Sequence, residues 1–348
     1  MQRNTLIQFL VACAALVIIL AGVKAAVEIV VPFLLSLFIA IICSPVIKWM
    51  TERKVPHWLA ISILFLAILV IFFFLVGLIN SSIREFSQSI PQYKVLLAER
   101  VNYLIMLAKK WNLSININKE VISDKLDPSA IMNFVSSLLM NFSNVVSSAF
   151  VLILVVVFML LEAPTAKYKL NLLLRNTAHE QWEEDGHLDR ILEGIIRYLG
   201  VKSAVSLLTG ILVWALLEIM NVQYAVLWAT LTFLLNYIPN VGSIIAAVPI
   251  ILQAFLLNGF VDGFIVAGGV IGINMIVGNV VEPKMMGRTL GLSTLVVFLS
   301  LLFWGWLLGT VGMLLSVPLT IALKIVLESS PSTQHYAVLL GNVQEEIK

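Results

Sequence analysis

Residues 224–257 read YAVLWATLTFLLNYIPNVGSIIAAVPIILQAFLL, and this stretch decides the class of fold. Two apolar runs, Tyr224–Tyr237 and Ser243–Leu257, meet at the sequence NYIPNVG. Each run is shorter than the about 20 apolar residues that cross the hydrocarbon of a bilayer. Short apolar segments joined by Pro, Asn and Gly are typical of a re-entrant hairpin or a broken helix in a membrane protein.

The rest of the chain has the same apolar character. Hydrophobic residues make up 60% of the 348 residues and charged residues only 12%, whereas soluble domains have about 25% charged residues. We therefore expect an all-α polytopic membrane protein with about seven or eight transmembrane helices, and with re-entrant or broken helices in the C-terminal third. The further apolar stretches are Leu6–Val23, Ile29–Cys43, Trp58–Ile79, Val145–Leu161, Ser203–Met220, Phe264–Val281, Leu292–Leu308 and Val311–Leu327.

Two polar inserts interrupt the apolar stretches and divide the chain. In the first insert, Asp127-Pro128 suits the start of an amphipathic helix that continues into the fourth span. In the second, an apolar stripe from Leu188 to Leu199 indicates an interfacial helix or a packing partner. The predicted parts are transmembrane helices 1–3 in 1–79, a helical insert in 80–144, helix 4 in 145–161, a helical insert in 162–202, interrupted transmembrane helices in 203–328, and a tail in 329–348.

The charges predict the orientation in the membrane. The loop between the second and third spans contains Lys48, Arg53 and Lys54 against Glu52, and such loops face the cytoplasm. Both termini and residues 162–202 are then expected in the cytoplasm, and residues 80–144 outside it. The first apolar run is longer than the core of a signal peptide, so we expect it to be retained as a helix.

Polar residues inside the C-terminal apolar region are the candidates for a transport pathway, because a polar group in low dielectric needs a partner. The same residues at the NYIPNVG motif are also compatible with a simple turn at the membrane surface. Glu282 is the candidate for ion coupling, although it can equally pair with Lys284 or Arg288 at the interface. The pathway candidates are Asn236, Tyr237, Pro239, Asn240, Gly242, Asn274 and Asn279.

A short internal similarity supports a transporter. Residues 241–249 (VGSIIAAVP) resemble residues 311–318 (VGMLLSVP), and duplicated interrupted segments indicate the repeat of a transporter. We expect helix breaks at Pro249, Pro283 and Pro318.

Other classes of function have no support in the sequence. The four histidines lack the spacing of a metal site, and the common nucleotide-binding and hydrolase motifs are missing from the sequence. The net charge of +2 gives no basic field for nucleic acid. Cys13 and Cys43 lie in apolar runs and are read as small hydrophobic residues. We expect no catalytic residue, no metal and no cofactor.

Several strings resemble the autoinducer-2 exporter family of PerM-like permeases. They are NYIPNVGS (236–243), YLGVKS (198–203), VPFLLSLFIAIICSPVI (31–47), IPQYK (90–94), LDPSAIM (126–132) and EPKMMGRTLGLSTLVVFLSLLFWGWLLGTVGMLLSVPLT (282–320). The resemblance implies a bacterial inner-membrane protein that exports autoinducer-2, a small furanone-like polyol, with indirect effects on biofilm and motility. It also implies a homo-oligomer, for which a pentamer is one expectation. The positions that match the family are Asn236, Pro239, Asn240, Gly242, Glu282, Pro283, Gly287 and Gly291.

Three functions stay open at this point. The first is an exporter of autoinducer-2 or a similar small polar solute, in which amides and loosened backbone exchange hydrogen bonds with the solute. The second is a sodium or lithium/proton antiporter that uses Glu282, since some relatives of the family resemble antiporters. The third is a membrane scaffold that acts through its polar inserts without transporting anything.

Overall fold

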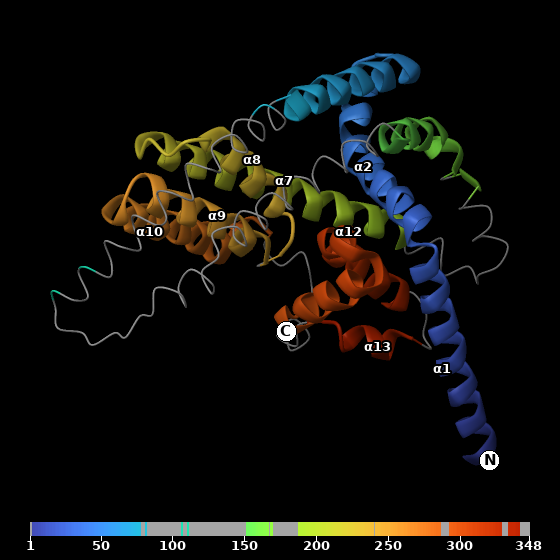
Figure 1. Ribbon diagram of the computed structural model, residues 1–348. Helices are drawn as coiled ribbons and strands as arrows, with labels where there is room; N and C mark the ends of the chain where they lie inside the picture. The colour runs from blue at the N-terminus through green and yellow to red at the C-terminus, as the bar shows by residue number, and fades with distance from the viewer. Residues whose placement is uncertain are drawn as a thin grey trace. The chain divides into compact units, whose positions relative to one another are not determined.

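The computed structural model describes residues 2–77, 81, 106, 110, 151–166, 168–169, 187–239, 241–286, 292–328 and 333–341. These ranges form helices and turns and contain no strand (Figure 1). The predicted all-α membrane fold is confirmed by helices that are long and apolar enough to cross a bilayer. The insert predicted for 80–144, including Asp127 and Pro128, lies almost wholly outside the described residues. The five long helices are Val27–Glu52, His57–Gly77, Asp189–Ile219, Phe260–Met286 and Thr294–Glu328.

The chain forms two compact units, and each has its own apolar core. The first unit contains residues 1–66, 151–203 and 284–348, and the second contains residues 67–150 and 204–283. In the first unit, α1 (Gln2–Ala25) packs on α2 (Val27–Glu52), and both contact α12 (Thr294–Glu328). The hydroxyl of Ser36 on α2 donates a hydrogen bond to the carbonyl of Leu152, 3.2 Å away. The cores bury Phe38, Ala40, Ile47, Ala60, Ile61, Val156, Leu160, Ile195, Tyr198, Leu199, Leu315, Val317 and Ile321.

The C-terminal tail packs on the first unit. Helix α13 (Gln334–Val338) contacts α12, and Ala337 is buried. The backbone N–H of Ser293, just before α12, donates to the carbonyl of Leu340 at 3.2 Å. Residues 333–341 of the predicted tail are thus a docked segment.

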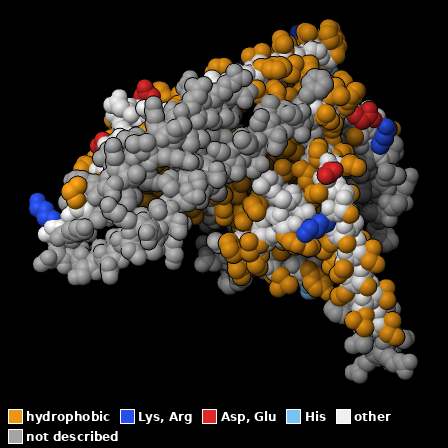
Figure 2. All heavy atoms as spheres, in the orientation of Figure 1, with side chains coloured by type: hydrophobic (Ala, Val, Ile, Leu, Met, Phe, Trp, Pro, Cys, Tyr) orange, Lys and Arg blue, Asp and Glu red, His pale blue; other side chains and the backbone are white. Residues whose placement is uncertain are grey.

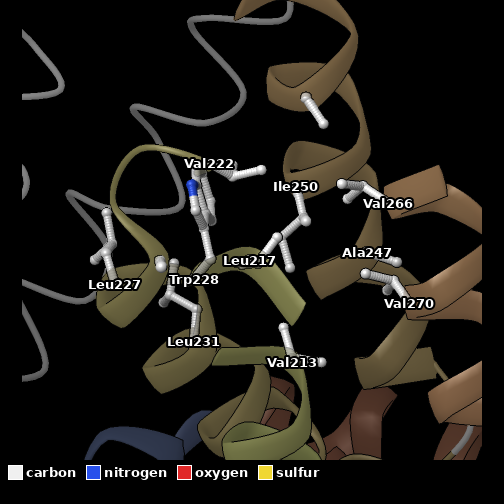
Figure 3. Packing of buried hydrophobic residues seen from close by; sticks show 12 residues of the cluster. Val213, Leu217, Val222, Leu227, Trp228, Leu231, Ala247, Ile250, Val266 and Val270 are labelled. Carbon is white, nitrogen blue, oxygen red and sulfur yellow. The ribbon is translucent and has the colours of Figure 1, made fainter. Parts of the chain in front are cut away.

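The second unit contains α8 (Ala225–Leu235), α9 (Val241–Leu257) and α10 (Phe260–Ile276), which lie side by side (Figure 1). Figure 3 shows apolar side chains from these helices and from α7 (His187–Ile219) pointing toward one another. These helices are apolar on most sides, so the packing buries the apolar residues on one side of each helix and leaves others, such as Val226, Val248 and Phe264, exposed. The core residues of this unit are Val213, Leu217, Val222, Ala225, Leu227, Trp228, Leu231, Ala247, Ile250, Ala254, Val266 and Val270.

Helix α7 runs without interruption from the second polar insert into the fifth predicted span. The predicted boundary lies between residues 202 and 203, yet the residues on both sides of it are helical. Ile195, Tyr198 and Leu199 are buried in the core of the first unit. The amphipathic stripe is therefore a packing surface, which is one of the two expectations for it.

Helix α12 is a hairpin in which the chain reverses direction at Gly309. The backbone of Gly309 has φ 71° and ψ −151°, inside a segment that is otherwise helical. A residue with a side chain rarely adopts such a conformation, so glycine fits this position. The predicted break at Pro318 is wrong, because Pro318 is buried within the second arm of the hairpin.

The α8–α9 connection is a second hairpin of similar construction. Pro249 lies inside α9, so the predicted break at this proline is also wrong. A helix continues through a proline where packing offsets the lost hydrogen bond, and both prolines are buried. In both hairpins the Val-Gly pair of the repeated sequence lies close after the reversal, and the Val-Pro pair lies further along the second arm.

Each hairpin has a glycine where its two arms come closest. A Cβ atom at Gly242 would overlap the backbone carbonyl of Leu235, and one at Gly312 would overlap the carbonyl of Trp304. An indole hydrogen bond joins the arms in each case. Trp228 Nε1 donates to Gln253 Oε1 at 2.7 Å in the first hairpin, and Trp304 Nε1 donates to Thr320 Oγ1 at 3.1 Å in the second.

Large apolar side chains cover much of the outer surface. Figure 2 shows hydrophobic side chains spread over the drawn face of the described residues, with few charged groups among them. Phe74 is 67% exposed and Val261 is 73% exposed. Such extensive apolar exposure in a folded chain fits contact with lipid.

We expect Gly242→Ala and Gly312→Ala each to lower the free energy of unfolding by about 1–3 kcal/mol, because the added methyl group overlaps backbone that has little room to shift. Thermal unfolding in detergent micelles measures the change. Gly268→Ala in α10 is the matched control, since a Cβ there meets nothing within 4 Å, and it should stabilise the helix by about 0.5–1 kcal/mol. Equal stability of Gly242→Ala and wild type would contradict the close approach.

Candidate functional site

The turn between α8 and α9 contains four of the predicted pathway residues. The backbone N–H of Asn236 donates to Thr232 at 2.9 Å, and that of Ile238 donates to Leu235 at 2.9 Å. The N–H of Gly242 donates to Ile238 at 3.2 Å as α9 begins. Pro239 fixes the backbone between these bonds. The turn is thus a defined structure in which Asn236, Tyr237, Pro239 and Gly242 lie together.

The side chain of Asn236 points into the second unit. It is 9% exposed, and its Nδ2 donates to Ser206 Oγ on α7 at 3.1 Å. Ser206 is fully buried. An amide and a hydroxyl therefore meet in an apolar interior, where hydrogen bonds are electrostatically stronger than in water. The sequence alone did not single out Ser206, because one serine in an apolar run is not a signal without its partner.

Tyr237 acts as an aromatic contact of the turn. Its ring packs edge-on against Phe233, with centroids 5.7 Å apart and an interplanar angle of 86°. This geometry is favourable for two aromatic rings. The contact ties the turn to the last residues of α8, so Tyr237 has a structural role beside any contact with a solute.

Asn274 lies on α10 at the same end of the second unit as the turn. Helices α9 and α10 run antiparallel because only Asn258 and Gly259 connect them. At 1.5 Å per residue, Asn274 and Ser243 both lie roughly 21 Å along their helices from this connection. The structure thus brings a second predicted amide to the level of the turn, although the two are far apart in sequence.

The remaining candidates lie beyond Asn274 on the same helical segment. Asn279 is exposed on the π-helix η1 (Val277–Val281). Glu282 is half-buried at the start of α11 (Glu282–Met286) and already interacts with another group of the chain. The predicted break at Pro283 coincides with the change from π-helix to α-helix. Asn240, Gly287, Arg288 and Gly291 lie outside the described residues.

A polar network lies at the opposite end of the second unit, and sequence reasoning did not find it. Trp228 donates to Gln253, and Gln253 Nε2 donates to the backbone carbonyl of Gln223 at 2.8 Å. Asn258 Nδ2 donates to the carbonyl of Met220 at 3.0 Å. Both amides thus donate hydrogen bonds to the backbone that connects α7 and α8. Because their hydrogen bonds are made within the chain, we assign them a structural role.

The site can offer neutral hydrogen-bonding groups in an apolar surrounding. The residues that the structure describes contain no group of three or more His, Cys, Asp and Glu that could hold a metal ion. Amides of Asn236 and Asn274 provide both donors and acceptors. Such groups can exchange hydrogen bonds with a polar solute without the cost of burying a charge.

Apolar membrane helices with helical hairpins and sheltered polar residues are typical of polytopic transport proteins. Residues 13–332 match the sequence model of the AI-2E transporter family. The chain belongs to this family, and it is a multi-pass bacterial membrane protein of the transporter class. Family membership thus assigns it to transport proteins.

Individual relatives support the same class. A Haemophilus influenzae relative, whose name describes a transport protein in general terms, is 67% identical over 346 residues, 99% of each chain. The AI-2 transport protein TqsA of Escherichia coli is 43% identical over 331 residues, 95% of this chain and 94% of TqsA. A sodium-lithium/proton antiporter of Halobacillus andaensis is 23% identical over 331 residues, 86% of this chain and 89% of the antiporter.

We expect Gln253→Leu to lower the free energy of unfolding by about 1–2 kcal/mol, because the indole N–H of Trp228 loses its acceptor in a buried position. Reversible unfolding in mixed micelles measures the loss. A double-mutant cycle with Trp228→Phe should give a coupling energy of about 1 kcal/mol. A coupling energy of zero would show that the 2.7 Å bond contributes nothing to stability.

Proposed function

We propose that this protein exports autoinducer-2 or a similar small polar solute across the bacterial inner membrane. The observation that supports this proposal most directly is the similarity to the AI-2 transport protein TqsA, which extends over nearly the whole length of both chains. The autoinducer is a small hydroxylated molecule, and its hydroxyl groups need hydrogen-bond partners wherever they leave water.

The turn of the first hairpin supplies suitable groups. Asn236 is buried beside Ser206, and Asn274 lies at the same level of the second unit. Asn240 and Asn279 are further candidates along this pathway. We propose that the amide of Asn236 exchanges its bond with Ser206 for a bond with the solute, which offsets the loss of the solute's hydration. Gly242 and Pro239 hold the turn that positions this amide.

The distribution of charged residues supports a proposal for the membrane topology, and the family resemblance supports a proposal for the oligomeric state. We propose that both termini and residues 162–202 lie in the cytoplasm, and that residues 80–144 lie on the outer side of the inner membrane. We also propose a homo-oligomer, with a pentamer as the form to test by native mass spectrometry. Lipid is the main partner of the apolar outer surface.

An antiporter of sodium or lithium against protons is the second candidate. The named antiporter among the relatives supports it, and Glu282 is a half-buried carboxylate near the π-helix. A carboxylate that binds either a proton or a metal cation can couple the two fluxes. In this scheme Glu282 would replace Asn236 as the residue on which transport depends.

Efflux from proteoliposomes distinguishes a direct solute contact from a structural role of Asn236. We expect Asn236→Leu to raise the KM for autoinducer-2 by about tenfold, because it removes the amide that meets the solute. Ser206→Ala is the matched control, since it breaks the same internal hydrogen bond but keeps the amide, and we expect a change in KM of about twofold or less. Equal effects of both variants would contradict a direct contact.

Glu282→Gln separates the two transport mechanisms. We expect this variant to export autoinducer-2 at the wild-type rate, because the proposed solute contacts are neutral. Sodium-driven proton movement, followed with a pH-sensitive dye in the same vesicles, tests the antiporter. Proton movement that Glu282→Gln abolishes would favour the antiporter, and vesicles that move neither solute nor protons would favour the scaffold.

A further inference from the structure

One buried oxygen atom of the second unit lacks a hydrogen-bond donor. The side-chain oxygen Oδ1 of Asn274 is buried, and among the described residues it is the one buried side-chain nitrogen or oxygen atom without a partner. Leaving such an atom unsatisfied costs about 1–3 kcal/mol. An amide at this position therefore destabilises the folded chain unless another molecule supplies a hydrogen-bond donor.

The position of Asn274 makes the missing donor more informative. Val270 and Val277, about one turn away on either side along the helix, are 1% and 3% exposed. An apolar side chain would suit the same surroundings. The adjacent buried positions on this side of the helix are thus apolar, and the packing of α10 does not require a polar side chain between them.

A second oxygen atom, in the backbone of the next turn, also lacks a hydrogen-bond donor from the helix. The N–H of Glu282 donates to the carbonyl of Val277, five residues earlier, which is the π-helical pattern. The next donor in that pattern would be residue 283, but Pro283 has no N–H. The carbonyl of Gly278 has therefore lost both of its helical donors, since residue 282 bonds to Val277 and residue 283 is proline.

Asn274 and Gly278 are four residues apart on one helical segment, so they lie on the same side of it, one turn apart. A Cβ atom at Gly278 would meet nothing within 4 Å, which leaves open space beside its backbone. The oxygen of Asn274 without a donor and the carbonyl oxygen of Gly278 without a helical donor are thus on successive turns of one helical segment, at the turn end of the second unit.

We propose that Asn274 Oδ1 and the carbonyl oxygen of Gly278 form a subsite that accepts hydrogen bonds from the hydroxyl groups of a neutral solute. Two neutral oxygen atoms do not balance the charge of a bare cation in low dielectric, and Glu282 already interacts within the chain. This subsite rests on the transport function proposed above and names the chemistry of its solute.

The test uses the full chain and compares affinity with stability. Asn274→Leu replaces the amide by an apolar side chain of similar size, and Pro283→Ala returns a backbone N–H to the carbonyl groups of η1. We expect each variant to weaken binding of autoinducer-2 by about 2- to 10-fold in proteoliposome efflux and in ligand-induced thermal shifts. Glycerol and erythritol serve as further hydroxylated probes in the thermal shifts.

Stability separates binding from folding. We expect the melting temperature of Asn274→Leu without ligand to equal or exceed that of wild type, because an unsatisfied buried acceptor has been removed. Asn258→Ala is the matched control: it removes an amide that donates to backbone carbonyls, so it should lower the melting temperature and leave the KM unchanged. A lower melting temperature of Asn274→Leu would reveal a donor within the chain and overturn the proposal.

The remaining outcomes are also decisive. Equal shifts by all hydroxylated probes in wild type and Asn274→Leu would overturn the subsite, even if wild type exports autoinducer-2. A shift by glycerol or erythritol that Asn274→Leu loses would support the subsite, even if autoinducer-2 is not exported. Stabilisation by NaCl over choline chloride that Asn274→Leu abolishes would identify a cation as the occupant and overturn the proposal.

Discussion

The bilayer offers the backbone no water, so each N–H and C=O at membrane depth has to find its partner inside the protein. Helices satisfy this requirement by themselves, and any interruption has to be sheltered and bonded by its surroundings. The two hairpins show how this chain meets the condition. Glycine lets the arms approach closely at Gly242 and Gly312, and an indole hydrogen bond holds the arms together in each hairpin.

The same requirement separates structural polar groups from candidate functional ones. Gln253 and Asn258 use their hydrogen bonds to hold the connection between α7 and α8. Asn236 has a single side-chain partner that it can exchange, and the oxygen of Asn274 has none. Polar residues of one chemical type therefore differ in function according to whether the protein itself satisfies them.

Much of the fold follows from the sequence, because long apolar runs leave few alternatives to membrane helices. The turn at Asn236 and Pro239 was predicted for the same reason, since polar and helix-breaking residues interrupt an apolar run. The local sequence pattern did not predict features that depend on how side chains and helices pack together. The helices continue through Pro249 and Pro318 because both prolines are buried, and the pairing of Trp228 with Gln253 depends on helices meeting in space. The reversal at Gly309, in contrast, falls between the predicted stretches Leu292–Leu308 and Val311–Leu327.

The short arms of the first hairpin have a consequence for biogenesis. Helix α8 has 11 residues and α9 has 17, which correspond to roughly 16 and 26 Å of helix. Helix α8 is too short to cross about 30 Å of hydrocarbon and α9 is at the lower limit of about 17 residues, so a translocon cannot release α8 alone as a stable span. The two arms have to enter the lipid as a pair with the turn already closed, which delays this step of membrane insertion until α9 has been synthesised.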